Sequence, residues 1–171
     1  IFAASSSAYG ETEELPKRET MRPMPLSPYA VSKLACEQYL EVFAGIYGLE
    51  TVNLRYFNVF GPGQTPDGAY AAAIPRFVDR ALARKPIEIF GDGEQTRDFC
   101  FVKNTVAANL LAADSPRKFK GEVMNVAGAR RIGLNDLCLR IGEVLGEKVD
   151  VVHGPARAGD IRHSLGAIDR A

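Results

Sequence analysis

The spacing of apolar residues predicts an alternation of strands and helices along the chain. Residues 28–47 follow a Ser27-Pro28 pair suited to a helix start, repeat apolar side chains with a helical period and stop at Gly48. The β-branched and aromatic run Thr51–Phe57 is typical of a strand. Further helices are predicted at 71–84, 104–113 and 134–145, and strands at 1–4, 87–90, 99–102, 122–127 and 149–152. The Glu- and Pro-rich stretch 9–25 predicts a surface loop, and Gly91-Asp-Gly93 a turn between two short strands.

The order of these elements predicts an α/β fold. The first strand, the helix 28–47 and the next strand make a βαβ unit, which implies a parallel sheet with a right-handed crossover. The chain begins at Ile1 inside an apolar run and ends at Ala171, where a further helix is expected to start. We therefore expect the 171 residues to be a piece of a longer protein.

Composition argues against several classes of partner. Lys+Arg and Asp+Glu are both 21, so no excess charge indicates a nucleic acid or an anionic membrane. No apolar run reaches the roughly 18 residues that a membrane-spanning helix needs, and no signal peptide is recognisable. Three widely spaced cysteines and two histidines have no metal-binding spacing and predict buried thiols in a reducing compartment, hence a cytoplasmic protein.

The pair Tyr29 and Lys33 is the strongest candidate for chemistry. At i and i+4 the two side chains share one helix face, and the lysine charge favours a phenolate that can take a proton. The same spacing also fits an ordinary exposed pair on a helix. The expected position of the helix favours chemistry, because Ser5–Ser7, Phe57-Asn58 and Gly128 follow predicted strands at the sheet edge where ligands bind.

A tyrosine that takes the proton of an alcohol performs half of an oxidation. The other half needs a hydride acceptor, which implies a nicotinamide cofactor. The glycine-rich turn that normally holds a dinucleotide is not recognisable, because Gly61-Pro-Gly63 and Gly91-Asp-Gly93 lack both the third glycine and the strand-turn-helix context. That turn lies upstream of Ile1, or the chain binds no dinucleotide.

Several linked motifs resemble one family. Together they cover nearly all 171 residues, in the order A-A-S-S-S-A-Y-G (3–10), S-P-Y-A-V-S-K (27–33), L-R-Y-F-N-V-F-G-P (54–62), G-D-G-E-Q-T-R-D-F (91–99), N-V-A-G (125–128) and R-A-G-D-I-R-H-S (157–164). The chain resembles the extended short-chain dehydrogenase/reductases, within them the nucleotide-sugar epimerases, and most of all the bacterial UDP-N-acetylglucosamine 4-epimerases. This resemblance implies the C-terminal part of a Rossmann-like doubly wound parallel sheet plus a smaller α/β substrate-binding lobe. Residues 1–60 and 103–128 would belong to the NAD-binding domain, and 61–102 and 129–171 to the lobe.

The resemblance also implies roles for individual residues. Ser5, Tyr29 and Lys33 would be catalytic and would contact NAD, with Phe57 against the nicotinamide. Arg97 and Arg157 would bind the diphosphate of a UDP-sugar, a role that suits guanidinium forks. The remaining substrate contacts would be Ser6, Asn58 at the diphosphate, Ala72, Phe90 by the base, Asp160 at the ribose and Ser164.

Two serines narrow the expected reaction. Related 4,6-dehydratases and decarboxylases carry carboxylates one or two residues after the catalytic Ser/Thr, where this chain has Ser6 and Ser7. Epimerisation at carbon 4 through a transient 4-keto sugar is therefore expected. The small Ala72 and Ser164 leave room for a 2-acetamido group, so N-acetylated UDP-hexoses are expected to be accepted.

Alternative functions stay open at this stage. The chain fits a UDP-glucuronate 4-epimerase, another nucleotide-sugar epimerase, or a non-catalytic nucleotide-binding module. The preferred UDP-sugar and the choice between NAD and NADP also stay open. The isolated piece is expected to be inactive, and the resemblance implies a homodimer formed through the helix 28–47.

Overall fold

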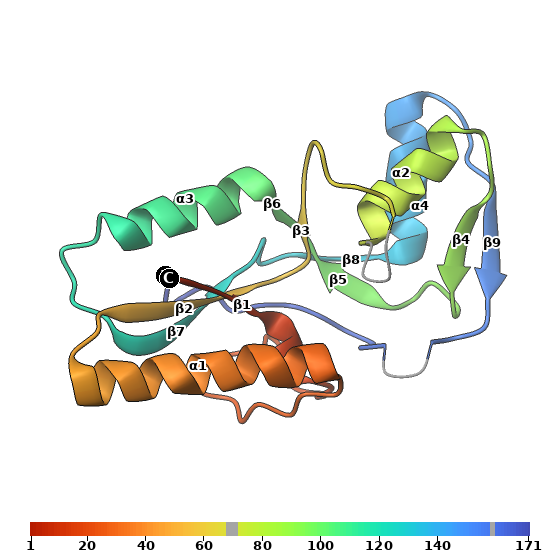
Figure 1. Ribbon diagram of the computed structural model, residues 1–171. Coiled ribbons are helices and arrows are strands. Elements are labelled where there is room, and N and C mark those ends of the chain that lie inside the picture. Colours follow the sequence, from red (N-terminus) through yellow and green to blue (C-terminus); the bar gives the residue numbers. More distant parts are fainter. Residues whose placement is uncertain (68–71, 158–159) are drawn as a thin grey trace.

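The computed structural model describes residues 1–67, 72–157 and 160–171 and has an α/β fold (Figure 1). Its helices are α1 (Pro28–Tyr47), α2 (Ala73–Leu82), α3 (Val102–Ala113) and α4 (Leu134–Leu145), with a 3-10 turn, η1 (Ser6–Tyr9). Its strands are β1 (Phe2–Ser5), β2 (Thr51–Tyr56), β3 (Val59–Phe60), β4 (Ile87–Phe90), β5 (Thr96–Asp98), β6 (Cys100–Phe101), β7 (Lys120–Val126), β8 (Arg131–Gly133) and β9 (Val151–Gly154). No helix in the described ranges is both long and apolar enough to cross a membrane.

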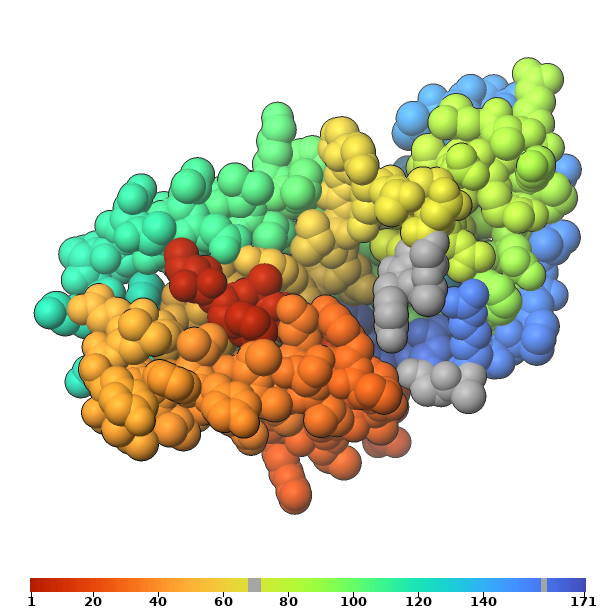
Figure 2. All heavy atoms as spheres, in the orientation of Figure 1, coloured from red at the N-terminus to blue at the C-terminus, as the bar shows by residue number. Residues whose placement is uncertain are grey.

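A parallel sheet of three strands forms the first part of the molecule. Its order is β1-β2-β7, with α1 on one face and α3 on the other (Figure 1). The predicted βαβ unit and parallel pairing are therefore confirmed. Figure 2 shows the N-terminal residues at the surface between α1 and α3, because β1 is the edge strand of this sheet in the described part of the chain.

The two faces of β2 differ in chemistry. On the α3 side its apolar residues join a buried cluster of Val52, Leu54, Cys100, Met124 and Val126. The alternate residues are polar and equally buried, because successive side chains of a strand point to opposite faces. Thr51 bonds to Leu40 of α1, Asn53 to Gly121, and Arg55 to Glu37 of α1.

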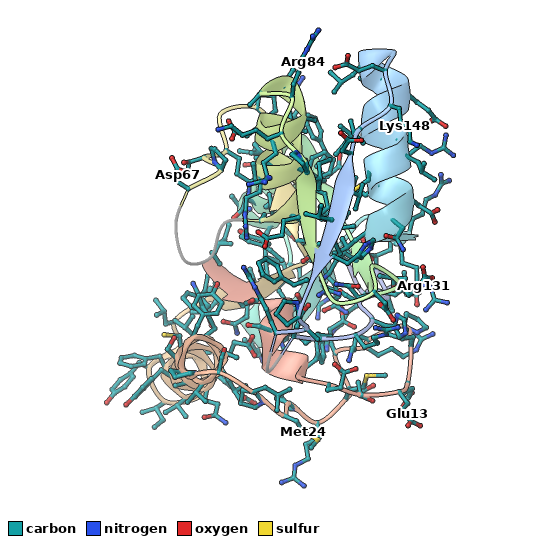
Figure 3. The ribbon with its side chains drawn as sticks, turned by 90° about the vertical axis from the view of Figure 1, so that its right-hand side faces the viewer. Glu13, Met24, Asp67, Arg84, Arg131 and Lys148 are labelled. Carbon is teal, nitrogen blue, oxygen red and sulfur yellow. The ribbon has the colours of Figure 1, made fainter. Side chains whose placement is uncertain are left out.

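A second core holds the other part of the molecule together. Strands β4 and β9 pair in parallel, and α2 and α4 pack on them (Figure 1). Apolar side chains of α2, β4 and α4 form this core, and charged side chains such as Arg84, Arg131 and Lys148 project from the periphery (Figure 3). Its buried members are Phe77, Ala81, Ile87, Ile89, Leu134, Leu137, Cys138 and Ile141.

Several predicted bounds are wrong because strand pairing sets them. Of the expected strand 99–102 only Cys100–Phe101 forms a strand, β6, parallel to β3, because Val102 already begins α3. A separate strand, β5, precedes it and is antiparallel to β8. The strands β4 and β5 that flank Gly91–Gly93 do not pair with each other. The expected strand 149–152 lies instead at Val151–Gly154, where the register of β4 places it.

Helix starts and ends are closer to expectation. The Ser27 hydroxyl accepts from the Ala30 N–H at 3.2 Å, and Gly48 closes α1 with a φ of 68°. The expected helix 71–84 spans Ala73–Leu82, while Ala71 lies outside the described residues.

The expected surface loop 9–25 is partly buried, which corrects that prediction. Tyr9 and Lys17 are both buried. The backbone of Lys17 pairs with residues 165 and 167, and the Tyr9 hydroxyl bonds to Asn125 of β7. The Lys17 ammonium donates to the Gly10 carbonyl at 3.1 Å.

A buried carboxylate joins the two parts. Asp98 is 0% exposed, and its oxygens accept the N–H groups of Gly128 at 2.8 Å and Gly166 at 3.0 Å. Burial raises the pKa of Asp98, while the backbone donors around it oppose that rise. The residue thus ties β5 to the loop after β7 and to the C-terminal segment.

We expect Asp98→Asn to lower the free energy of unfolding by about 2 kcal/mol, because an amide turns an NH₂ group toward one of the two backbone donors. Chemical denaturation of the full-length protein measures this. Asp114→Asn at an exposed position is the matched control and should change stability by less than about 0.5 kcal/mol. Equal effects of the two substitutions would contradict the role of Asp98.

The cysteines should differ sharply in reactivity. Burial raises the pKa of Cys138 to about 11 and also raises that of Cys100, whereas Cys36 is partly exposed. Because the thiolate is the reactive form, an alkylating agent at neutral pH should modify Cys36 first and the other two only after denaturation. Peptide mass mapping reads each site, and native labelling of Cys138 as fast as that of Cys36 would contradict the buried core.

Candidate functional site

A cavity of about 610 Å³ lies at the carboxyl ends of β1 and β2. Residues from both parts of the molecule line it. Nine of the predicted site residues are among them: Ser5, Ser6, Tyr29, Lys33, Asn58, Ala72, Arg97, Asp160 and Ser164. The geometry therefore brings residues far apart in the sequence to one place at the sheet edge.

Ser5 ends β1 and caps η1. Its hydroxyl oxygen accepts from the Ser7 N–H at 3.2 Å and from the Ser7 hydroxyl at 2.8 Å. A serine hydroxyl has one hydrogen to donate. With Ser7 donating both bonds, the Ser5 hydrogen is left to donate to another acceptor.

Tyr29 and Lys33 lie in the first two turns of α1. The Lys33 ammonium nitrogen donates to the Ala3 carbonyl oxygen at 2.9 Å and lies 5.7 Å from the centroid of the Tyr29 ring. Tyr29 is 42% exposed and lines the cavity. The strand therefore holds a positive charge beside the tyrosine, as the spacing of the two residues predicts.

A second cavity of about 300 Å³ adjoins the first. Arg97 and Asp160 line both cavities, and the Arg97 Nη2 lies 2.5 Å from the Asp160 Oδ1. Phe90 and Arg157 line the smaller one, with the guanidinium carbon 3.7 Å from the ring centroid. Arg76 also lines it, so three arginines face two carboxylates, Glu88 and Asp160. The excess of arginine and the aromatic face make this cavity suited to an anionic ligand that carries a flat ring.

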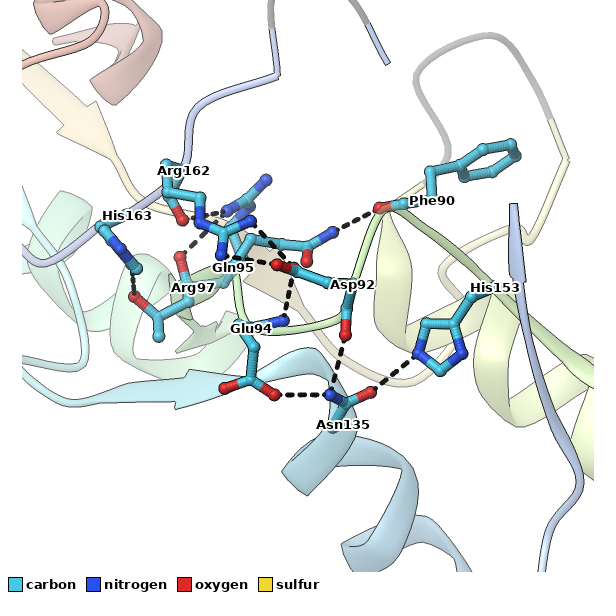
Figure 4. A network of polar contacts seen from close by, with 10 residues as sticks. Phe90, Asp92, Glu94, Gln95, Arg97, Asn135, His153, Arg162 and His163 are labelled. Atoms are coloured by element: carbon cyan, nitrogen blue, oxygen red, sulfur yellow. Dashed lines mark hydrogen bonds and ion pairs between the residues drawn. The ribbon is translucent and has the colours of Figure 1, made fainter. Parts of the chain in front are cut away.

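A polar network holds the segment that carries Asp160 and Ser164 (Figure 4). The Arg162 guanidinium donates to both carboxylate oxygens of Asp92 at 2.9 and 2.8 Å and lowers the pKa of Asp92 to about 2. One residue on, the His163 Nδ1 lies 3.0 Å from the Thr96 hydroxyl. The turn 91–93 thus anchors the segment against β5.

The placement of Phe57 corrects an expectation. Its side chain is 0% exposed, with its ring centroid 6.3 Å from that of Tyr9, and it does not line the cavity. Its neighbours Tyr56 and Asn58 do. Tyr56, the last residue of β2, points away from Phe57 by strand alternation, whereas Asn58 lies beyond the strand with a φ of 20°. Strand alternation could have identified Tyr56, whose hydroxyl bonds the Asn109 amide at 3.0 Å.

Other cavity residues were not predicted. Ser7, Ser27 and Ile161 line it from within the quoted motifs, but no ligand contact was predicted for them, and Gln64 lies outside every motif. Asn58, which was predicted, donates one amide N–H to the Asp98 backbone carbonyl at 2.9 Å, which leaves its side-chain oxygen and its second N–H for a ligand.

Neither glycine pair forms a dinucleotide-binding turn in the described residues. Gly61 follows the short β3 and packs on Val102, and Gly93 packs on Asn135. Neither glycine opens a helix directly after a strand of the parallel sheet.

Comparison with known proteins identifies the fold and the family. Over 98% of its length the chain superposes with a TM-score of 0.93 and 45% identity on a UDP-N-acetylglucosamine 4-epimerase from Methanobrevibacter ruminantium in complex with UDP-N-acetylmuramic acid, covering 53% of that chain. With a TM-score of 0.89 and 31% identity it matches a UDP-glucuronic acid 4-epimerase from Bacillus cereus bound to UDP-glucuronic acid and NAD, covering 98% of this chain and 52% of that one. A UDP-glucose 4-epimerase of Mycolicibacterium smegmatis is 34% identical over 162 residues, which is 95% of this chain and 51% of the relative.

The chain therefore spans about half the length of the curated relatives it matches. A family model described as "NAD dependent epimerase/dehydratase family" matches residues 1–127, which include β1, α1, β2 and β7. The relatives and the fold agree with that match, and the chain belongs to the NAD dependent epimerase/dehydratase family.

Proposed function

We propose that the full-length protein epimerises a UDP-hexose at carbon 4 with NAD as its cofactor. One observation carries this proposal. A single cavity joins the hydroxyls of Ser5 and Tyr29 and the ammonium of Lys33 to Arg97 and Asp160, which also line the smaller cavity. Acid/base groups thus adjoin groups suited to a nucleoside diphosphate.

Each acid/base residue has a distinct role in this proposal. Tyr29 takes the proton of the sugar 4-hydroxyl and later returns it, and Lys33 stabilises its phenolate. Ser5 donates its remaining hydrogen to the same sugar oxygen. Bound NAD supplies the reversible hydride acceptor that no side chain provides.

NAD fits the donor set at this edge of the sheet. Ser5, Tyr29 and Lys33 lie beyond the carboxyl end of β1, where parallel sheets bind nucleotides. They would contact the reactive end of the cofactor. We assign residues 1–60 and 103–128 to the cofactor-binding domain, and 61–102 and 129–171 to the lobe that binds the sugar nucleotide.

The smaller cavity would hold the uridine diphosphate. Arg97 and Arg157 bind the diphosphate, Phe90 lies by the base and Asp160 binds the ribose. Arg97 and Asp160 also bond to each other, at the place where the two cavities meet.

The scarcity of carboxylates in the larger cavity favours epimerisation over dehydration or decarboxylation. Among the described residues that line it, Asp160 is the one carboxylate, and it is bonded to Arg97. Ser6 and Ser7 stand where the related dehydratases and decarboxylases carry their additional acids. No carboxylate in this described set is left for the extra proton transfers that those reactions need.

A homodimer through α1 belongs to the same proposal. Several apolar side chains of α1 are exposed, which suits an interface. They are Val31, Tyr39, Val42, Phe43, Ile46 and Tyr47.

A nucleotide-binding module without catalysis is the second candidate. The smaller cavity favours it, since Phe90, Arg97 and Arg157 lie against a core of their own. A full-length protein that binds UDP but interconverts no UDP-sugar would support this candidate against the first.

We expect Tyr29→Phe to lower kcat for the interconversion of UDP-GlcNAc and UDP-GalNAc by about 10²- to 10⁴-fold, because the substitution removes the proton-transfer group. Chromatography of the two sugars in the full-length protein measures this. Tyr39→Phe on the same helix is the matched control: it removes a hydroxyl outside both cavities and keeps the ring for the proposed interface, so activity should stay near wild type. Similar activities of the two variants would contradict the role of Tyr29.

Ser164→Tyr tests the proposed sugar. Ser164 lines the cavity, and a bulky ring there should exclude the 2-acetamido group. We expect loss of UDP-GlcNAc epimerisation with UDP-glucose turnover largely kept, measured side by side on both sugars. Ser164→Ala controls for loss of the hydroxyl. If Ser164→Tyr lost activity equally on both sugars, Ser164 would not be the residue that makes room for the N-acetyl group.

A further inference from the structure

A fully buried ion pair fastens α1 to the sheet. Glu37 lies one helical turn beyond Lys33, and Arg55 lies on β2. The guanidinium donates to both carboxylate oxygens, from Nε at 2.9 Å and from Nη2 at 2.6 Å. The side chains of Arg55 and Glu37 are only 3% and 4% exposed, so solvent does not screen this fork.

The same guanidinium contacts the element that Ser5 begins. Its central carbon lies 4.5 Å from the centroid of the Tyr9 ring, at the end of η1, and Ser5 is the N-cap of η1. In the sheet register Arg55 stands opposite Ala4, the residue before Ser5. One side chain therefore meets both the helix of Tyr29 and the turn of Ser5.

The other end of this contact is also held in place. The Tyr9 hydroxyl donates to the Asn125 side-chain oxygen on β7 at 2.7 Å, and the Asn125 amide donates to the Lys17 and Ala167 carbonyls. The ring that faces Arg55 therefore has a fixed position relative to the sheet.

A contribution to the free energy of unfolding does not by itself explain why Glu37 and Arg55 are charged. Replacing a buried ion pair by apolar side chains is often neutral or stabilising. The Arg55 Nη1 is buried without a hydrogen-bond partner among the described residues, which adds to the cost of burial. The opposite face of the same strand packs mainly through a buried apolar cluster, with no charged side chain in that cluster among the described residues. What a bidentate fork adds is a defined position and rotation of the helix.

We propose that Glu37 and Arg55 are positioning residues for the acid/base groups. They hold α1 at the rotation that places Tyr29 and Lys33 beside Ser5, and neither lines either cavity that contains the proposed site. The inference rests on the proposed function, since it assigns these residues to the proton transfer. A misplacement of about 1 Å can cost about a hundredfold in rate.

Loss of the Glu37–Arg55 pair should not displace Phe90 and Arg157, which are proposed to bind the nucleotide in the smaller cavity. Phe90 and Arg157 line the smaller cavity together with Phe77 of α2 and Leu134 of α4, which belong to a core separate from that of β2. Loss of the pair should therefore lower kcat and leave KM for the UDP-sugar nearly unchanged. A merely structural role would instead lower the melting temperature and affect kcat and KM together.

The test is the double variant Glu37→Leu/Arg55→Met in the full-length protein, assayed with UDP-GlcNAc. We expect kcat to fall at least about tenfold, KM to stay within about twofold and the melting temperature to stay near wild type. Arg140→Met/Glu143→Leu removes an exposed pair on α4 in the same way and is the matched control, with no change expected. Unchanged kcat in the folded double variant would overturn the inference.

Two further measurements keep the inference testable. If the double variant does not fold, Arg55→Lys keeps a charge opposite Glu37 but cannot form the fork, and it should show the same split of kcat and KM at smaller size. Hydrogen exchange of the α1 amides reads the anchoring without turnover, and faster exchange around Tyr29 is expected in either variant. A wild-type protein without epimerase activity would defeat the proposed function alone, whereas wild-type exchange in a folded variant would defeat the positioning role.

Discussion

The buried carboxylate of Asp98 is the constraint on which the site depends. It accepts backbone N–H groups from Gly128 and Gly166, so one side chain sets where three separate segments meet. A Cβ at Gly128 would lie 2.5 Å from the Phe99 carbonyl oxygen, so the close approach requires glycine there. Because Arg97 precedes Asp98 and Ser164 lies two residues before Gly166, these bonds also place two residues of the cavity.

The two helices that cover the sheet contact the central strand β2 in different ways. Toward α3 it packs mainly through apolar side chains, with one polar contact between the Tyr56 hydroxyl and Asn109. Toward α1 its side chains are polar: Thr51 and Arg55 bond to the helix, and Asn53 bonds to Gly121 of β7. The helix held by the buried ion pair is the one that carries Tyr29 and Lys33, and its rotation matters for the proton transfer that we propose.

Local signals explain which parts of the fold could be predicted. The ends of α1 follow from Ser27 and Gly48, which act on their own turns, and the C-terminal end of α4 follows from Gly146 in the same way. The short strands β3 and β8 could not be predicted, because they consist of two or three residues defined only by partners far along the chain. The burial of Lys17 has the same cause, since residues near position 166 cover it.

The sequence motifs predict which residues belong to the site more readily than they predict where each side chain points. Motif positions identified nine cavity residues, but the motif did not tell which way Phe57 points, since that depends on whether Tyr56 or Phe57 faces the sheet edge. The packing of Gly166 on the Phe57 ring decides it, with the Cζ 3.0 Å from where a Cβ would lie. Contacts of this range leave no local pattern in a single sequence.

Ser7 shows how one position can separate related reactions. A carboxylate there would add an acid/base group beside Tyr29, and with it a route to reactions beyond carbon 4. The Ser7 hydroxyl and N–H both donate to Ser5 instead, which orients the Ser5 hydrogen toward other acceptors. In the function that we propose, the position therefore supports the proton transfer at one hydroxyl and supplies no second base. On this reasoning the reaction is limited as much by the groups beside the Tyr-Lys pair as by the pair itself.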